Sequence, residues 1–116
     1  MSIPESIARI EYETFNGCSS LKNVSLADSV TFIGQSAFKE CTSLTEVTFP
    51  PSLTTIGYNS FFGCSSLSKV EIPSSVKLIE SNAFSECPKL EKVDVPSSTT
   101  LGYCVFPDKT EITTID

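Results

Sequence analysis

The sequence contains no histidine and no tryptophan, and it has one methionine among 116 residues. Histidine is the side chain that titrates near neutral pH and the commonest general base and metal ligand, so its absence argues against the familiar forms of acid–base and metal catalysis. Basic residues are scarce as well, with 8 Lys and Arg against 14 Asp and Glu and a net charge of −6. Such a protein has little with which to displace counterions from a phosphate backbone, so we expect no nucleic-acid partner.

Long apolar runs and targeting signals are also missing. No stretch approaches membrane-spanning length, and residues 1–5 have neither the basic region nor the apolar core of a signal peptide. We therefore expect no membrane insertion, and a chain that is either cytoplasmic as written or part of a longer secreted protein. Apolar residues make up 40% and charged residues 19% of the chain, which argues against disorder, and the length suits one domain.

What the sequence does contain is a repeat of 23 residues. Apolar residues recur with this period in seven columns over four copies, and such regularity is the signature of a repeat architecture. The columns are Phe15, Phe38, Phe61, Phe84; Cys18, Cys41, Cys64, Cys87; Leu21, Leu44, Leu67, Leu90; Val24, Val47, Val70, Val93; Leu26, Phe49, Ile72, Val95; Ile7, Val30, Leu53, Val76; and Ile10, Ile33, Ile56, Ile79.

Two polar columns keep the same period. One is a proline column that has Ala27 in a single copy, and the other is a serine column: Pro4, Pro50, Pro73, Pro96; Ser6, Ser29, Ser52, Ser75, Ser98. A fifth copy continues after one deletion, and we align its Phe106, Ile112 and Ile115 with the residues 22 positions earlier, Phe84, Leu90 and Val93. The register then persists nearly to Asp116, which predicts a single repeat domain over residues 1–116.

The local pattern within one copy predicts β-structure. Residues 24–26 and 70–72 alternate between apolar and polar side chains, which is typical of a half-buried strand, and the proline that follows should end it. A second short strand is expected near residues 52–56, whereas residues 35–40 are too few for a stable α-helix and should be 3₁₀ or irregular. Stacked turns would align the apolar columns into one core. We therefore predict a solenoid of about five 23-residue turns, built mostly of parallel strands.

The third copy reads Leu67-x-x-Val70-x-Ile72-Pro73-x-Ser75-Val76-x-x-Ile79-x-x-x-Ala83-Phe84-x-x-Cys87. It resembles the unit L-x-x-I-x-I-P-x-x-V-x-x-I-G-x-x-A-F-x-x-C of the BspA-like (Treponema-type) leucine-rich repeats, and the resemblance extends over essentially the whole chain. It implies a leucine-rich-repeat solenoid. It also implies a cell-surface or secreted location, in proteins of mucosa-associated bacteria and protozoan parasites that are proposed to bind host proteins or other cells.

The cysteine column invites three interpretations. Metal binding is disfavoured because the cysteines are 23 residues apart, unpaired and without histidine. Disulfides between adjacent turns are disfavoured because side chains in one register point the same way, whereas a disulfide needs converging Cβ atoms. We expect Cys18, Cys41, Cys64 and Cys87 to be reduced and to act as small buried apolar groups, and Cys104, outside the column, to be the exposed thiol.

The serine column has no base beside it, and an unactivated hydroxyl is a poor nucleophile. We expect a structural ladder in which Ser6, Ser29, Ser52, Ser75 and Ser98 bind backbone groups at a tight turn, by analogy with the asparagine ladder of other leucine-rich repeats.

Outward positions on the first strand of each copy change chemistry from turn to turn, unlike the core columns. In leucine-rich repeats these strands line the concave face, so the resemblance implies a binding strip of mixed charge: Asn23, Ser25, Glu46, Thr48, Lys69, Glu71, Lys92, Asp94. The alternative is a plain solvated sheet face. Asn23-Val24-Ser25 is also a glycosylation sequon, and we expect it to be unused because a glycan would block the strip.

Three classes of function remain. The favoured one is a non-enzymatic protein-binding or adhesion module without cofactors, whose partner is a protein such as a host or neighbouring-cell surface protein; the alternative is a structural element that associates with itself. An ice-binding solenoid would need a regular threonine array, which the row Ser25, Thr48, Glu71, Asp94 is not. No catalytic base, metal set or phosphate loop is visible, so we expect no enzymatic activity.

The ends carry no capping helix or charged run, and terminal repeats normally have a polar cap. The alignment places the last strand short of its fifth-column residue. We therefore expect a segment of a longer array or a homo-oligomer that associates through its terminal turns, by way of Ile3, Ile7 and Ile10 at one end and Ile112 and Ile115 at the other.

Overall fold

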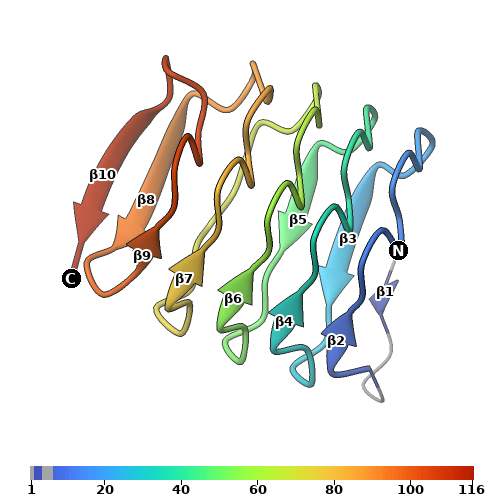
Figure 1. The fold of residues 1–116 in the computed structure, drawn as a ribbon, viewed down its shortest axis with the longest axis horizontal. Helices are drawn as coiled ribbons and strands as arrows, with labels where there is room; N and C mark the ends of the chain where they lie inside the picture. Colours follow the sequence, from blue (N-terminus) through green and yellow to red (C-terminus); the bar gives the residue numbers. More distant parts are fainter. Residues whose placement is uncertain (1, 4–6) are drawn as a thin grey trace.

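A computed structural model describes residues 2–3 and 7–116. The chain winds into a parallel β-solenoid of about five turns, with successive turns about 23 residues apart. Each turn lies beside the next along the long axis, and the two ends of the chain lie at opposite ends of the solenoid (Figure 1). The described residues form no helix, and therefore none that could cross a membrane. The predicted fold is confirmed.

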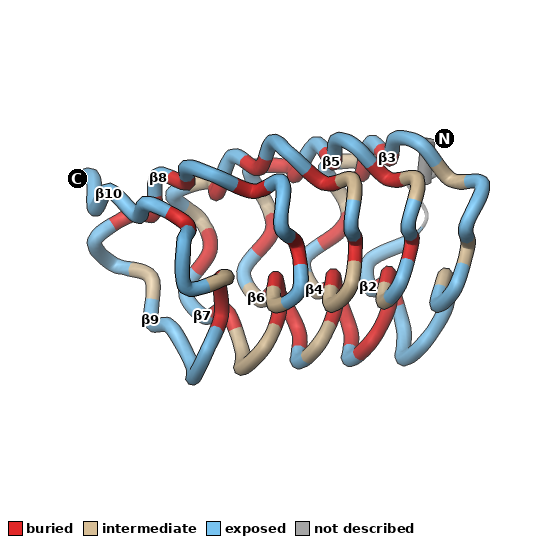
Figure 2. The backbone as a smooth tube through the Cα atoms, turned by 90° about the horizontal axis from the view of Figure 1, so that it is seen from above, coloured by how far each residue is buried: buried red, intermediate tan, exposed pale blue. Residues whose placement is uncertain are grey.

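Two layers of parallel strands face each other across the core (Figure 2). One layer is a continuous sheet of five short strands: β2 (Arg9–Ile10), β4 (Phe32–Ile33), β6 (Thr55–Ile56), β7 (Leu78–Ile79) and β9 (Thr100–Leu101). The other layer has two parts: β1 (Ser2–Ile3), β3 (Asn23–Leu26) and β5 (Glu46–Thr48) form one, and β8 (Lys92–Pro96) and β10 (Glu111–Ile115) form the other. We call this second layer the divided layer.

The core between the layers consists of the apolar columns predicted from the sequence. Phe38, Phe61 and Phe84 have no exposed surface, and the rings of successive turns stack with centroids 5.1–5.4 Å apart and planes within 12°. Residues of one column lie next to each other in successive turns because backbone hydrogen bonds hold neighbouring turns in register. One of these bonds joins Phe38 N and Ser60 O at 2.7 Å. The stack runs from Phe15 to Phe106 and gives all five turns one common core.

The segments after the five-stranded sheet are irregular, as predicted. They are held by i→i+3 backbone hydrogen bonds, such as Ala37 N to Gly34 O, and by bonds to the next turn. Each turn bends at a residue with positive φ, in a column formed by Glu13, Ser36, Asn59, Asn82 and Cys104, with φ between 53° and 61°. Asparagine tolerates this left-handed conformation well, whereas Cys104 is an unusual occupant.

One predicted strand is missing. Residues 70–72 alternate like a strand, yet the structure has only an isolated bridge between Glu46 and Lys69 at this turn. The ladder that joins β3 to β5 therefore stops, and pairing resumes only between β8 and β10. Val70 and Ile72 are still buried, so the turn keeps its place in the core while it lacks a regular ladder with its neighbours.

The alignment of the fifth copy was right for Phe106, which stacks on Phe84, but wrong for Ile112 and Ile115. Ile112 pairs with Val93 and Thr114 with Val95, so the last turn is shorter than the sequence comparison indicated and does reach its fifth-column position. Thr110 takes the place expected for Ile112: it is buried, and its Oγ1 donates a hydrogen bond of 2.6 Å to the carbonyl oxygen of Leu90. Because the leucine column is occupied here by a polar residue, Thr110, the search for apolar columns did not find the correct register.

Candidate interaction surface

All eight residues of the strip predicted from the sequence are exposed. Strand pairing brings them into rows, with Asn23 beside Glu46 and Ser25 beside Thr48, and the bridge adds Lys69 to the first of these rows. Their sequence neighbours Val24, Val47, Val70 and Val93 are buried. Because side chains alternate along a strand, the strip forms the outward face of the divided layer.

The fifth turn extends the strip by two residues that the sequence analysis missed. Glu111 pairs with Lys92 and Thr113 with Asp94, and both are exposed. They were missed because the misaligned fifth copy assigned Ile112 to the wrong column. The signal for the correct register is short: Glu111-Ile112-Thr113 has the polar, apolar, polar pattern of Lys92-Val93-Asp94.

The surface is hollowed on both sides of the interrupted turn. A hollow of about 340 Å³ lies toward β5, and its lining includes the polar Glu46, Thr48, Lys69 and Glu71 and the apolar Phe49 and Ile72. A second of about 500 Å³ lies toward β8 and is lined by Lys69, Val70, Glu71, Ile72, Lys92, Asp94 and Ile115. These hollows lie at the centre of the strip, and each combines charged rims with apolar side chains.

Among the described residues, no charged side chain of the strip is held by a close ion pair. Lys69 Nζ and Glu71 Oε1 are 3.8 Å apart, and their side chains are 65% and 85% exposed. Ion pairs this exposed contribute little to stability. Both side chains can therefore exchange this contact for one with a partner at small cost.

The cysteine column lies in the irregular segments between the strands, outside the divided layer. Cys41, Cys64 and Cys87 have no exposed surface, Cys18 is half-buried, and all four are free thiols. Each buried thiol donates a hydrogen bond to the carbonyl oxygen of a phenylalanine in the preceding turn, at 3.1–3.2 Å. Burial raises the pKa of the Cys41 thiol to about 11 and that of Cys87 to about 12, so these thiols stay protonated near neutral pH.

The comparisons with known proteins agree with this geometry. A model of the BspA type leucine rich repeat region matches residues 1–113, with 6 copies. The chain belongs to the BspA-type leucine-rich repeat family. A search of curated proteins found none that matches.

Solved structures show how similar leucine-rich repeat proteins are built. A leucine rich cell surface protein from Faecalibacterium prausnitzii matches all of this chain at 33% identity, with a TM-score of 0.88. A leucine-rich repeat protein from Bacteroides ovatus matches 94% at 40% identity, with a TM-score of 0.85. The chain spans 32% and 28% of their lengths. A leucine rich repeat protein of T. pallidum matches 97% at 27% identity, with a TM-score of 0.60.

The serine column of this leucine-rich repeat domain is only partly a ladder of hydrogen bonds. Ser29 Oγ donates to Ile7 O at 2.7 Å and Ser52 Oγ donates to Val30 O at 2.8 Å, each across one turn. In the last turn Thr99 donates the equivalent bond, to Val76 O at 2.8 Å, in place of the exposed Ser98. Two members depart from the expected role: Ser75 Oγ is buried without a hydrogen-bond partner among the described residues, and Ser6 lies outside them.

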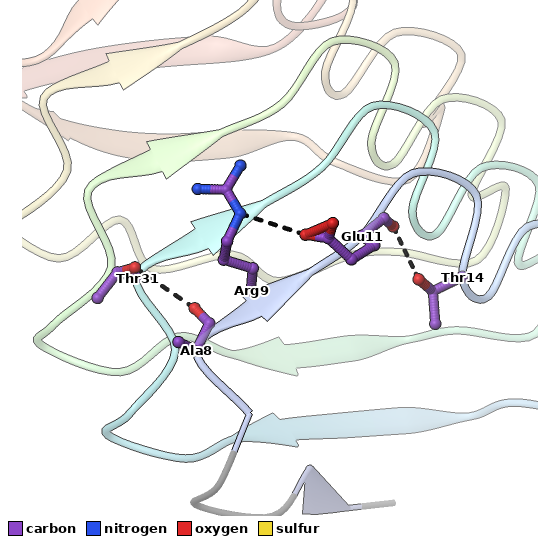
Figure 3. Close-up of polar contacts among 5 residues, drawn as sticks. All are labelled: Ala8, Arg9, Glu11, Thr14 and Thr31. Atoms are coloured by element: carbon purple, nitrogen blue, oxygen red, sulfur yellow. Dashed lines mark hydrogen bonds and ion pairs between the residues drawn. The ribbon is translucent and has the colours of Figure 1, made fainter.

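The five-stranded sheet of the repeat domain has its own outward row, which the sequence analysis missed: Arg9, Phe32, Thr55, Leu78, Thr100. The Arg9 guanidinium lies 3.9 Å from the centre of the Phe32 ring, and its Nε donates to Glu11 Oε1 at 3.2 Å (Figure 3). Thr31 Oγ1 also joins the first two turns, by donating to Ala8 O at 3.4 Å (Figure 3). Arg9 therefore has two close partners within the protein, whereas Lys69 of the strip has only the longer contact with Glu71.

Proposed function

We propose that this leucine-rich repeat domain is a non-enzymatic protein-binding or adhesion module, and that its partner binds the strip on the divided layer. The observation that carries the proposal is the contrast between the two sides of the same strands. In the four turns that carry the strip, inward positions are apolar and buried, whereas outward positions, such as Ser25, Thr48, Glu71 and Asp94, are all exposed and are polar in some turns and charged in others. A face with no structural constraint on its side chains can be adapted to a partner without loss of the fold.

The two hollows beside the interrupted turn support the same face as the binding surface. Binding energy in protein interfaces is concentrated in a few central contacts that exclude water. Lys69, Glu71 and Ile72 border both hollows, so partner side chains that enter them would contact charged and apolar groups together. We assign the centre of the interface to these three residues.

A location at the cell surface, or a secreted one, is part of the proposal. It is supported by the description of the F. prausnitzii relative as a cell surface protein. The partner would then be an extracellular protein, on a host cell or on a neighbouring cell. We include no cofactor and no catalytic step, because the sequence has no histidine and the described residues hold no cluster of three or more Cys, Asp or Glu suited to a metal.

Retention of protein-coated beads on epithelial monolayers tests this function. More beads coated with the chain should be retained than beads coated with an unrelated acidic protein. The double variant Glu71→Lys with Asp94→Lys should lower the number retained about tenfold. A matched control, Glu40→Lys with Glu86→Lys on the irregular segments after the five-stranded sheet, makes the same charge change at exposed positions outside the strip and should retain binding. Retention that is equal for the two double variants, or no higher than background for the chain itself, contradicts the proposal.

Self-association is the second candidate, and one observation favours it. All five residues of β10 are exposed, with Ile112 at 45% and Ile115 at 42%. A second copy that paired along β10 would cover these side chains. At the other end Ile7 is 37% exposed, whereas Ile10 is 3% exposed and has no surface to contribute, and the side chain of Ile3 lies outside the described residues.

A further inference from the structure

All three tyrosines of the chain occupy one column of the repeat, immediately after the five-stranded sheet. The column reads Tyr12, Gln35, Tyr58, Ser81, Tyr103, so tyrosine stands in alternate turns. We call these five residues the tyrosine row. Tyr12 is 62%, Tyr58 40% and Tyr103 84% exposed, which makes the row the main display of exposed aromatic surface among the described residues.

Backbone hydrogen bonds hold the row in register. The carbonyl oxygens of the last four members accept bonds of 2.9–3.2 Å from the residue that follows the row in the preceding turn: Glu13 N to Gln35 O, Ser36 N to Tyr58 O, Asn59 N to Ser81 O and Asn82 N to Tyr103 O. Parallel backbone bonded in this way advances about 4.8 Å per turn. Successive tyrosines therefore lie roughly 9–10 Å apart along the solenoid, with a shorter side chain between each pair.

This spacing matches the repeat of a polyproline II helix. Such a helix has 3 residues per turn and rises about 3.1 Å per residue, so it repeats about every 9.3 Å. A peptide with proline at every third position would place successive prolines over Gln35 and Ser81, between the tyrosine rings. Tyrosine suits this role because its ring packs on proline while its hydroxyl can donate to the solvated carbonyl groups of the peptide.

The charge beside the row selects a basic peptide. The ten positions directly before and after the five row residues include Glu11, Glu13 and Glu80 and no Lys or Arg. Arg9 neutralises Glu11, and Asn16 donates to Glu13, which leaves the carboxylates of Glu13 and Glu80 to give the row its negative charge. An arginine or lysine that flanks the prolines would be attracted to them.

We propose that the tyrosine row is a second binding site, distinct from the strip, for an extended proline-rich peptide that carries basic residues. About seven residues of polyproline II helix span the row from Tyr12 to Tyr103. The site does not depend on the function proposed for the strip, because it lies on the turns that follow the five-stranded sheet rather than on the outward face of the divided layer.

Titration with synthetic peptides tests this site, and the absence of tryptophan leaves tyrosine as the protein's own fluorescent reporter. The probe is a peptide of about ten residues with proline at every third position and arginine at both ends. We expect saturable quenching of tyrosine emission, and weaker binding when the arginines are replaced by glutamine. A peptide of the same composition with its prolines moved to every fourth position should bind at least tenfold more weakly.

Calorimetry with variants locates the site. Tyr58→Ala and the highly exposed Tyr103→Ala should each weaken binding about tenfold, whereas Tyr58→Phe, which keeps the ring, should stay within about threefold. Glu71→Lys with Asp94→Lys in the strip should leave peptide affinity unchanged. The proposal is overturned if the peptide does not bind at about 1 mM, if both alanine variants bind it equally well, or if proline spacing has no effect. It is also overturned if an extended β-linked oligosaccharide binds the row more tightly than the peptide, since the aromatic row would then be a sugar site.

Discussion

The thiol of Cys64 donates a hydrogen bond of 3.1 Å to the carbonyl oxygen of Phe38, one turn earlier in the solenoid. Cys41 and Cys87 make the same contact with Phe15 and Phe61. The phenylalanine and cysteine columns are therefore linked, because each of these three cysteines donates to a backbone carbonyl oxygen of the phenylalanine that stacks in the preceding turn. The Phe38 oxygen also accepts from the backbone N–H of Cys41 at 3.3 Å, so a purely apolar side chain at position 64 would leave it one hydrogen bond instead of two.

Thiol labelling should separate the five cysteines by burial. The thiolate is the reactive form, and burial raises the pKa of Cys41, Cys64 and Cys87. We expect a maleimide to label the exposed Cys104 quickly and these three only after unfolding, as measured by intact mass with and without denaturant. Cys104→Ser should remove the fast-labelling site. Labelling of native Cys64 as fast as Cys104 would show that the column is open to solvent.

The same thiols should make stability fall at high pH. The pKa of Cys41 is raised from 9.0 to about 11, so below pH 9 this thiol is protonated in both states and its contribution is constant. Above that, the unfolded chain loses thiol protons that the folded chain retains, and the free energy of unfolding decreases toward pH 11. Urea titrations should show a shallower decrease for Cys64→Ala and an unchanged one for Val76→Ala, which removes buried apolar atoms but no thiol. Equal slopes for both variants would contradict the role of burial.

Two adjacent phenylalanines provide a matched test of the stack. Phe61 has no exposed surface and stacks on rings in both neighbouring turns, whereas Phe62 is partly exposed. Phe61→Ala should lower the free energy of unfolding by about 3–5 kcal/mol, and Phe62→Ala by about 1 kcal/mol or less. Chemical denaturation measures both. Similar losses of stability for the two variants would mean that the phenylalanine stack contributes no more to stability than a partly exposed ring.

Sedimentation at rising protein concentration tests self-association through β10. We expect the sedimentation coefficient to increase with concentration for the chain and to stay at the monomer value for Ile112→Lys with Ile115→Asp. Leu78→Lys replaces an exposed leucine on the five-stranded sheet and serves as the control, which should still associate. If the chain remains monomeric at every concentration, or if the double variant associates as strongly as the unmodified chain, β10 is not the site of self-association.

The fold was predictable because every core column repeats one chemical type. Phe15 to Phe84 and Ile10 to Ile79 fix both the period and the direction in which the turns stack. The missing ladder at residues 70–72 was not predictable, since these residues alternate as well as any strand in the chain. Whether two such segments pair depends on the spacing of neighbouring backbones, which local alternation does not encode.

The candidate sites show the same limit. The eight strip residues could be chosen from the sequence because they alternate with buried valines, but the hollows beside Glu71 and Ile72 arise from the lost pairing. Glu111 and Thr113 were missed because Thr110, a polar residue, fills a leucine position in a shortened turn. The tyrosine row was open to detection by its spacing alone. It was overlooked because the search for repeats followed apolar core columns.

Site-specific crosslinking tests the central claim, that the partner binds the outward face of the divided layer. In a Cys104→Ser background, a photoactivatable benzophenone is attached at Thr48→Cys on the strip or at Thr54→Cys beside the five-stranded sheet; both threonines are exposed. Each labelled protein is bound to epithelial monolayers, irradiated and analysed for covalent adducts. The account predicts an adduct with a cell-surface protein from position 48 and none from position 54. Adducts from position 54 alone, or from neither position while the protein is retained on the cells, would contradict it.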